Sequence, residues 1–472
     1  PVVIVRSDGS LMSETFTAAR PVETLLCGPA ASVAGGLALT REPDAVLVDM
    51  GGTTTDIALL RAGSPARTRE GIQVGKWRTF VRGVLMETFG LGGDSAIRFT
   101  PDGRLTLGPE RVIPLCAAAA RWPGVLPRLA AIVADARPHS RMLHEFLCLQ
   151  KEPAGRDAFT AQELALCQVL ADGALPVSEA AAAVGSDHYR LKTDRLEREG
   201  IVMRIGLTPT DMMHLKGDFD RFDREAARLG AAYVAAQVGI PEDSLPDRVY
   251  DLVRKTLYIG IVRFLLEEAD PELRKKGLGH GLERLIEESW HMAADTREGS
   301  GRRLEAEDLA EGKPVPFLQF GFRTAAALVG LGAPTHLFLP DVARALGTRC
   351  VVPEHAAVAN AVGAVTGSVS ATREIAIRPL QSDEGGEVYV LYGADRDRTL
   401  PDLEEAIAAA RQEAEDAALR EARARGASGD LSVRSEVAME SVQSRERIDV
   451  LLGVTVTATA AGCIARGSGT GI

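Results

Sequence analysis

The sequence of 472 residues is poor in cysteine and in aromatic side chains, and it has no long apolar run. Its six cysteines include no CxxC pair, which argues against a disulfide framework and against a zinc site. They are Cys27, Cys116, Cys148, Cys167, Cys350 and Cys463. We expect reduced thiols and therefore a cytoplasmic protein. No apolar segment reaches the roughly 18 residues of a membrane-spanning helix, and no signal peptide is evident.

An excess of basic charge is also missing. The chain has 54 Lys and Arg against 65 Asp and Glu, a formal net charge of −11. An acidic chain is a poor candidate for binding nucleic acid or anionic membranes, so we expect neither partner. The length predicts roughly three domains. The chain begins PVVIVRSDG, without Met and already as a strand, so we expect a fragment of a longer protein.

The most informative stretch is AVLVDMGGTTTDIALL, at residues 45–60. Two apolar strands flank a glycine turn that carries a carboxylate at each end, Asp49 and Asp56. Gly51 and Gly52 let the backbone approach a phosphate closely, and the threonine hydroxyls add donors. Two carboxylates beside a phosphate site indicate a Mg²⁺ ion, which proteins hold through one or two carboxylates plus phosphate oxygens. Alternatively, the aspartates cap their own turn.

A second glycine motif begins at Gly330 and reads GLGAPT, and the segment PEHAAVANAVGAV follows it. Small residues such as Ala356, Ala359 and Gly363 would leave room for a flat ligand such as a purine. Tight helix–strand packing explains the same residues equally well.

The rest of the chain shows four segments. We predict an ATPase-fold segment at 1–115, a helical insertion at 116–206, a helical region leading into the second glycine motif at 207–370, and a C-terminal α/β unit at 371–472. Within the insertion, two helices, a basic helix and two short strands in LEREGIVMRIGLTPT resemble a winged helix.

Taken together, these motifs resemble one family. DMGGTTTDIALL is similar to the second phosphate hairpin of the actin/Hsp70/sugar-kinase (ribonuclease H-like) ATPase fold, and VGLGAPTHLFLPDVARALG is similar to its adenosine motif. The ordered set RPVETLLCGPAASVAGG, DMGGTTTDIALL, GLGGDSAIRF and GLTPTDMMHLKGDF resembles the hydantoinase A/5-oxoprolinase family.

The resemblance implies an ATP-dependent hydrolase that phosphorylates the carbonyl oxygen of a cyclic amide, such as a hydantoin or 5-oxoproline, before water opens the ring. It implies ATP and Mg²⁺ as cofactors, an oligomer, and a second, hydantoinase B-like subunit as partner. The implied catalytic and metal-binding residues are Asp49 and Asp56. The implied nucleotide-binding residues are Gly51, Gly52, Thr53, Thr54, Gly92, Gly93, Asp94, Ser95, Gly330, Gly332, Ala333 and Pro334. Thr208, Thr210 and Asp211 match a motif that we place on the substrate side.

The chain departs from the family pattern at three places. The first phosphate hairpin of the fold, a DxGGTxTD-like motif, has no copy, so we expect the chain alone to be inactive. Cys27 stands where the family has Ser, as a catalytic thiol or as a small buried residue. Asp94 stands where many relatives have Gly, and it either adds to cation binding or caps its turn.

Three alternatives remain at this point. The protein can be a chaperone-like reactivating ATPase of the same fold rather than a hydrolase. It can be a winged-helix transcription regulator, although the acids among Arg190, Lys192, Arg195 and Arg198 are unlike a DNA-reading helix. A histidine metal site is the third, but the pairs His139/His144 and His280/His291 lack helical i, i+4 spacing, and we expect surface or capping histidines.

Overall fold

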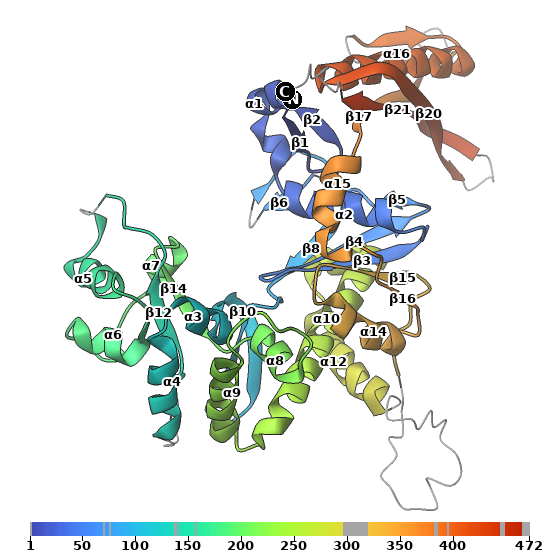
Figure 1. Cartoon of the computed structure of the whole chain (residues 1–472). Coiled ribbons are helices and arrows are strands. Elements are labelled where there is room, and N and C mark those ends of the chain that lie inside the picture. The colour runs from blue at the N-terminus through green and yellow to red at the C-terminus, as the bar shows by residue number, and fades with distance from the viewer. Residues whose placement is uncertain are drawn as a thin grey trace, which may run out of the picture. The chain divides into compact units, whose positions relative to one another are not determined.

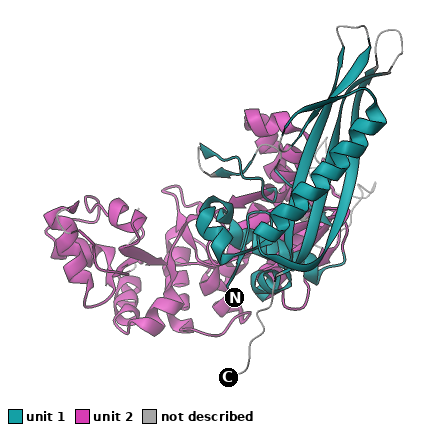
Figure 2. Ribbon diagram, turned by 90° about the horizontal axis from the view of Figure 1, so that it is seen from above, with its two compact units in different colours: residues 1–41, 63–85, 358–472 teal, residues 42–62, 86–357 magenta. Residues whose placement is uncertain are grey.

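The computed structural model of the chain has a mixed α/β architecture that divides into two compact units. It describes residues 2–68, 71–74, 77–135, 139, 141–155, 158–295, 320–381, 386–393, 396–443 and 449–464. Unit 1 comprises residues 1–41, 63–85 and 358–472, and unit 2 comprises residues 42–62 and 86–357, teal and magenta in Figure 2. Among the described helices, none is both long and apolar enough to cross a membrane.

Unit 1 begins with a small hairpin and a helix that follow from the opening sequence. Strands β1 (Val3–Val5) and β2 (Leu11–Ser13) pair antiparallel around the turn at Asp8 and Gly9. Helices α1 (Glu14–Ala19) and α2 (Cys27–Leu39) follow, and β6 (Gln73–Val74) pairs with β7 (Trp77–Arg78). Buried Arg6 forms an ion pair with Glu23 and another with Asp8, which satisfies three charges inside this unit.

Helix α2 crosses helix α15 (Ala359–Thr366) of the same unit at very short range, as Figure 1 shows. Glycines make the approach feasible: a Cβ at Gly35 would lie 1.8 Å from the carbonyl oxygen of Ala359, and a Cβ at Gly363 would lie 1.9 Å from that of Ala31. Any side chain at either glycine must therefore push the helices apart. The small residues of both segments thus serve helix packing.

The C-terminal part of unit 1 is a five-stranded antiparallel sheet with one helix on it (Figure 1). The strand order is β19 (Arg398–Leu400), β18 (Glu387–Tyr392), β17 (Val369–Gln381), β21 (Asp449–Ile464) and β20 (Ala427–Gln443). Helix α16 (Leu403–Ala424) buries alanines at every fourth position, from Ala406 to Ala422, against Val454 and Val456. This region therefore combines a sheet with a covering helix, within the larger unit 1.

The central sheet of unit 2 is built around the hairpin of β3 (Ala45–Met50) and β4 (Thr55–Arg61). Strand β15 (Ala327–Leu331) pairs parallel with β3, β16 (Cys350–Val351) extends that side, and β8 (Met86–Phe89) pairs with β4. Val46 and Val48 are completely buried, and Leu47 on the opposite face is 1% exposed. The nearly all-apolar strands therefore lie in a sheet covered on both faces, as their sequence indicates.

The insertion of unit 2 has a second sheet in the order β11-β14-β12-β13. Its elements are β11 (Ile113–Pro114), α3 (Leu115–Arg121), α4 (Val125–Ala134), β12 (Phe146–Leu149), α5 (Ala161–Leu170), β13 (Leu175–Pro176), α6 (Val177–Ala183), α7 (Asp194–Arg198) and β14 (Val202–Gly206). The expected second strand after β14 is wrong, because Pro209 begins a helix there. Strand β14 instead pairs with β12 and β11, which precede the helices in sequence.

Helices complete unit 2. They are α8 (Pro209–Lys216), α9 (Arg224–Val238), α10 (Leu245–Ala269), α11 (Pro271–Lys276), α12 (Gly279–Asp295) and α14 (Thr335–Ala345). A hairpin of β9 (Ser95–Phe99) and β10 (Leu105–Arg111) turns at Asp102–Gly103. Part of the segment 207–370 that we predict as a helical region, residues 296–319, lies outside the described residues.

The α2–α15 crossing predicts a contrast between two glycines of one helix. Gly35→Ala should lower the free energy of unfolding by about 1–3 kcal/mol, because the added methyl overpacks the crossing. Gly28→Ala is the matched control, since nothing lies within 4 Å of its would-be Cβ. It should leave stability unchanged or raise it by up to about 1 kcal/mol. Denaturant unfolding of both variants measures this, and equal stabilities would contradict the packing argument.

Candidate functional site

The hairpin of β3 and β4 places two carboxylates directly opposite each other. Asp49 pairs with Asp56 in the antiparallel register, so both side chains leave the same face of the sheet. Both are half-buried. The Thr88 hydroxyl donates a hydrogen bond to Asp56. Burial, and secondarily the charge of Asp49, raises the pKa of Asp56 above its ordinary value of 3.8 despite that hydrogen bond.

The turn between the strands is closed by its own backbone. The Gly51 N–H donates to the Thr54 carbonyl at 2.9 Å, and the buried Thr55 hydroxyl donates to the carbonyl of Leu91 at 2.8 Å. Gly51, Gly52 and Thr53 are exposed, and Thr54 is half-buried. A backbone hydrogen bond therefore closes this turn. The tip therefore offers exposed backbone and hydroxyl groups beside the two carboxylates.

The second glycine-rich loop is hydrogen-bonded onto this turn. The Gly93 N–H donates to the Gly51 carbonyl at 3.1 Å, and the Asp94 N–H donates to the Gly52 carbonyl at 2.7 Å. A Cβ at Gly92 would lie 2.5 Å from the carbonyl carbon and oxygen of Gly52. Only glycine at position 92 allows this contact. The structure thus joins the predicted residues 51–54 and 92–95 in one assembly.

Two side chains of the second loop have partners within the protein. The Ser95 hydroxyl oxygen accepts a hydrogen bond from the Gly92 N–H at 2.9 Å, so Ser95 closes its own loop. Arg111 donates from Nε to one Asp94 oxygen at 3.2 Å, and its Nη2 lies 3.2 Å from the same oxygen in an ion pair. Burial raises the pKa of Asp94, and the Arg111 guanidinium opposes that rise. Sequence reasoning missed Arg111, because it lies 17 residues from Asp94, across the β9–β10 hairpin.

The Gly330 motif lies against the end of strand β3. Leu331 pairs with Asp49 in the parallel register, and Gly332 has a positive φ of 82°. A Cβ at Gly332 would lie 2.1 Å from the Met50 carbonyl oxygen and 2.9 Å from an oxygen of Asp49. Ala333 is exposed and Pro334 precedes helix α14. This turn therefore adjoins the carboxylate pair, as the nucleotide-site prediction requires.

The Thr208–Asp211 motif begins helix α8 with a capping box. The Thr208 side chain accepts from the Asp211 N–H, and Asp211 accepts from the N–H and hydroxyl of Thr208, each at 2.9 Å. Asp211 also accepts the N–H groups of Leu115 and Cys116, at 3.3 and 2.8 Å, and thereby caps helix α3. Thr210 donates from its N–H and its hydroxyl to the Gly93 carbonyl. These contacts give the motif a structural part; its substrate-side role stays a prediction.

The donor set at the hairpin fits Mg²⁺ better than a metal held by protein alone. Among the residues that the structure describes, no three His, Cys, Asp or Glu side chains gather in a way that could hold a metal ion. Mg²⁺ is usually bound by one or two carboxylates, with phosphate and water completing its octahedron. Asp49 and Asp56 supply two carboxylates next to exposed backbone N–H groups, which suits that mode.

The other cysteine and histidine candidates lie elsewhere. Cys27 starts helix α2 in unit 1 and is half-buried. His139 accepts the N–H of Arg141 at 3.0 Å, as a capping histidine would. His144 departs from our expectation, because it is fully buried and, within the described part of the chain, neither ring nitrogen has a hydrogen-bond partner. Burial lowers its pKa to about 4, so the ring is neutral at physiological pH.

Several basic residues of the insertion form ion pairs with acids. Arg195 contacts Glu163 and Glu199, and Arg204 contacts Glu145 and Glu197. Arg190 lies 3.4 Å from Asp187. A nucleic-acid surface needs arginines that are available to phosphates. These ion pairs take up part of the positive charge that such a surface would need.

Comparison with known proteins supports a family assignment for the first quarter of the chain. Residues 1–121 match the model of the hydantoinase/oxoprolinase family, which confirms the resemblance that the motifs indicate. No curated protein is similar enough in sequence to count as a match.

Two solved structures are similar over nearly the whole chain. An ATP-dependent caprolactamase from Pseudomonas jessenii superposes with a TM-score of 0.50 and 15% identity, over 99% of this chain and 54% of its own. Nucleotide-free acetone carboxylase, from work on ATP-dependent acetone carboxylation, gives a TM-score of 0.49 and 14% identity, over 98% and 52%. The chain therefore shares the caprolactamase fold and spans about half the length of these proteins.

The facing carboxylates predict a stability gain when one is removed. A folded-state pKa above the ordinary value means that the folded protein holds this proton more tightly, so ionised Asp56 costs stability at neutral pH. Asp56→Asn should therefore raise the free energy of unfolding at pH 7, by about 0.2–1 kcal/mol for a like-charged cross-strand pair. The gain should shrink as the pH falls toward 3.8, the ordinary Asp pKa. Chemical denaturation at several pH values, without divalent cations, measures it.

Asp172→Asn is the matched control, since Asp172 is an exposed aspartate after helix α5. It should change stability little at any pH. A destabilising Asp56→Asn at pH 7 would show that the two carboxylates support the hairpin rather than burden it.

Proposed function

Because the chain carries a hydantoinase/oxoprolinase family segment at residues 1–121, we propose that it belongs to an ATP-dependent enzyme that activates the carbonyl of a cyclic amide. In this proposal, a phosphoryl group passes from ATP to the amide oxygen. Water then adds to the carbonyl carbon, and the ring nitrogen takes up a proton and leaves, so that the ring opens to an acyl phosphate. A second water attacks the acyl phosphate and releases phosphate and the carboxylate. The names of the two similar structures support ATP use by proteins of this fold.

The observation that carries the proposal is the opposed pair Asp49 and Asp56 between two glycine-rich turns. Like charges placed directly opposite on neighbouring strands repel each other. Keeping both charges half-buried lowers the stability of the protein unless a cation lies between them. A divalent ion with nucleotide phosphates would supply that positive charge and would orient the phosphoryl group for transfer.

The remaining residues receive roles by their position around that pair. Gly52, Thr53 and Thr54 would donate to phosphate oxygens, because their turn is exposed, and Gly51 would keep the turn closed through its N–H. The loop 92–95 would hold that turn in shape. The turn Gly330–Pro334 would contact the adenosine, since it adjoins Asp49 on the far side of β3.

The finer fold assignment is part of the same proposal. We infer the actin/Hsp70/sugar-kinase arrangement from a β-hairpin with a glycine turn followed, on the neighbouring parallel strand, by the Gly330 turn. The insertion of three short helices on strand β14 would be a variant of the winged helix. A partner subunit and an oligomer belong to the proposal as well.

The proposal predicts that Asp49→Asn weakens the binding of Mg²⁺–nucleotide. The full-length protein and its variant should be titrated with Mg²⁺ and a non-hydrolysable ATP analogue in a calorimeter. We expect an affinity loss of about tenfold or more, since one carboxylate contact to the cation is lost. Asp172→Asn is the control and should bind as the unaltered protein does. Unchanged affinity in Asp49→Asn would remove the hairpin from the nucleotide site.

Phosphate release separates amide activation from other uses of ATP. Release by the full-length protein should increase when a cyclic imide is added and should be low in Asp49→Asn. Stimulation by a partner protein alone, with no response to any cyclic amide, would contradict the proposed reaction.

A further inference from the structure

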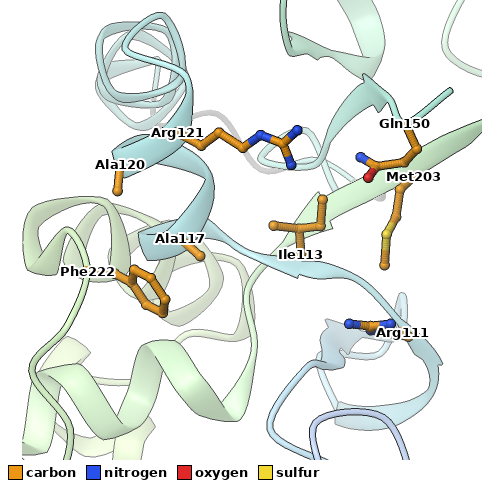
Figure 3. Close-up of a pocket in the computed structure, with 8 residues that line it drawn as sticks. All are labelled: Arg111, Ile113, Ala117, Ala120, Arg121, Gln150, Met203 and Phe222. Carbon is orange, nitrogen blue, oxygen red and sulfur yellow. The ribbon is translucent and has the colours of Figure 1, made fainter. Parts of the chain in front are cut away.

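A hollow of about 550 Å³ in unit 2 lies beside the end of strand β10 and the insertion (Figure 3). Strands β11 and β14 and helix α3 form most of its wall. Its lining residues are Arg111, Ile113, Ala117, Ala120, Arg121, Gln150, Met203 and Phe222. This volume lies within the roughly 300–1,000 Å³ of small-molecule sites.

The lining combines an apolar body with positive charge. Ile113, Met203 and Phe222 are half-buried and offer carbon and sulfur surface. Two guanidinium groups and one amide provide the polar contacts, and none of the eight lining residues is acidic. Figure 3 shows Arg121 and Gln150 extending toward each other, with Ile113 between Arg121 and Arg111. Such a lining suits a ligand with one anionic group on an apolar body.

Both arginines retain N–H groups for a ligand. Asp94 contacts only Nε and Nη2 of Arg111, and a guanidinium carries five N–H donors. The Arg121 guanidinium lies 4.5 Å from the ring centre of Trp122, a contact through its face rather than its N–H edge. A carboxylate can therefore approach either group in the plane of the guanidinium.

The thiol beside the hollow is not suited to covalent chemistry. Gln150 donates to the sulfur of buried Cys148 at 3.0 Å. Burial raises the pKa of Cys148 to about 11, so this thiol stays protonated at neutral pH. The hollow therefore suits recognition rather than nucleophilic attack by a cysteine.

The walls of the hollow are tied to the glycine loops of the hairpin. Arg111 holds Asp94, whose N–H donates to Gly52 at the hairpin turn. Asp211 caps helix α3, which supplies Ala117, Ala120 and Arg121. The neighbouring His214 accepts the Phe222 N–H at 3.1 Å and so fixes that wall residue. The hollow and the hairpin are thus parts of one hydrogen-bonded framework.

We propose that this hollow binds a small organic carboxylate with an apolar body, and that the positive charges of Arg111 and Arg121 attract its carboxylate. The assignment of this ligand as the molecule to be activated rests on the proposed function, whereas its binding does not. Because Arg111 also holds Asp94, a carboxylate bound through the remaining N–H groups would share this guanidinium with Asp94. Ligand binding would thereby be felt at the loop that supports the hairpin turn.

Calorimetry with an isosteric pair of probes tests the binding directly. Cyclopentanecarboxylate and its neutral carboxamide have the same apolar ring and differ in the charge that the arginines would recognise. We expect the carboxylate to bind at least tenfold more tightly than the carboxamide. Arg111→Met and Arg121→Met should each lower carboxylate affinity at least fivefold and should leave carboxamide binding unchanged.

Matched variants keep this test interpretable. Arg104→Met removes an exposed arginine in the β9–β10 turn, outside the hollow, and should bind the carboxylate normally. Arg121→Lys keeps the charge and should retain part of the affinity, which separates a lost charge from a misfolded variant. Equal binding of both probes, no binding of the carboxylate, or full binding by the Arg111→Met/Arg121→Met double variant would each overturn the proposal.

The Asp49→Asn variant separates this inference from the proposed function. Its hollow is intact, so it should bind the carboxylate as the unaltered protein does even when it no longer binds nucleotide. Carboxylate binding without any nucleotide binding in the unaltered protein would leave the pocket standing and would reject the ATP-dependent reaction. Nucleotide binding together with equal affinity for the two probes would reject the carboxylate site and would leave the ATP-dependent reaction standing.

Discussion

The candidate site in unit 2 depends on the repulsion between two carboxylates. Asp49 and Asp56 face each other at the end of a hairpin whose strands are otherwise largely buried, and burial raises the pKa of Asp56. A fold under selection for stability alone would replace one of them. The surrounding turns instead approach the hairpin so closely that only glycine fits at position 92, against the Gly52 backbone, and at position 332, against Met50 and Asp49. Stability is given up locally where a cation and phosphates would restore it.

Much of this region could be predicted from the sequence because its signals are local. The apolar runs, the glycine turn and the two aspartates all lie within residues 45–60, and antiparallel pairing then fixes which residues face each other. The contact between that turn and the loop 92–95 was suggested by family resemblance. Its reason, two backbone hydrogen bonds and the absence of a Cβ at Gly92, is visible only in three dimensions.

The sequence-based expectations that the structure does not bear out failed for physical reasons. The segment after β14 was expected to be a strand, yet Thr208, Pro209 and Asp211 form a capping box with proline in the first turn, a helix signal that was available. The contact of Arg111 with Asp94 and the hollow could not be predicted from the sequence, because the residues that form them come from separate segments of the chain. His144 could not be recognised as buried either, since its packing against Tyr233 is a tertiary contact 89 residues away in sequence.

The proposed function depends on a divalent cation that binds between Asp49 and Asp56 together with a nucleotide. The most direct measurement is a crystal structure of the full-length protein with Mn²⁺ and a non-hydrolysable ATP analogue, using the anomalous signal of Mn²⁺. We predict a peak between the two carboxylates and phosphates on the Gly51–Thr54 turn. The Mn²⁺ ion should lie about 2 Å from an oxygen of one aspartate, or should contact that oxygen through one bridging water. An ordered nucleotide whose cation lies away from both aspartates would contradict the account.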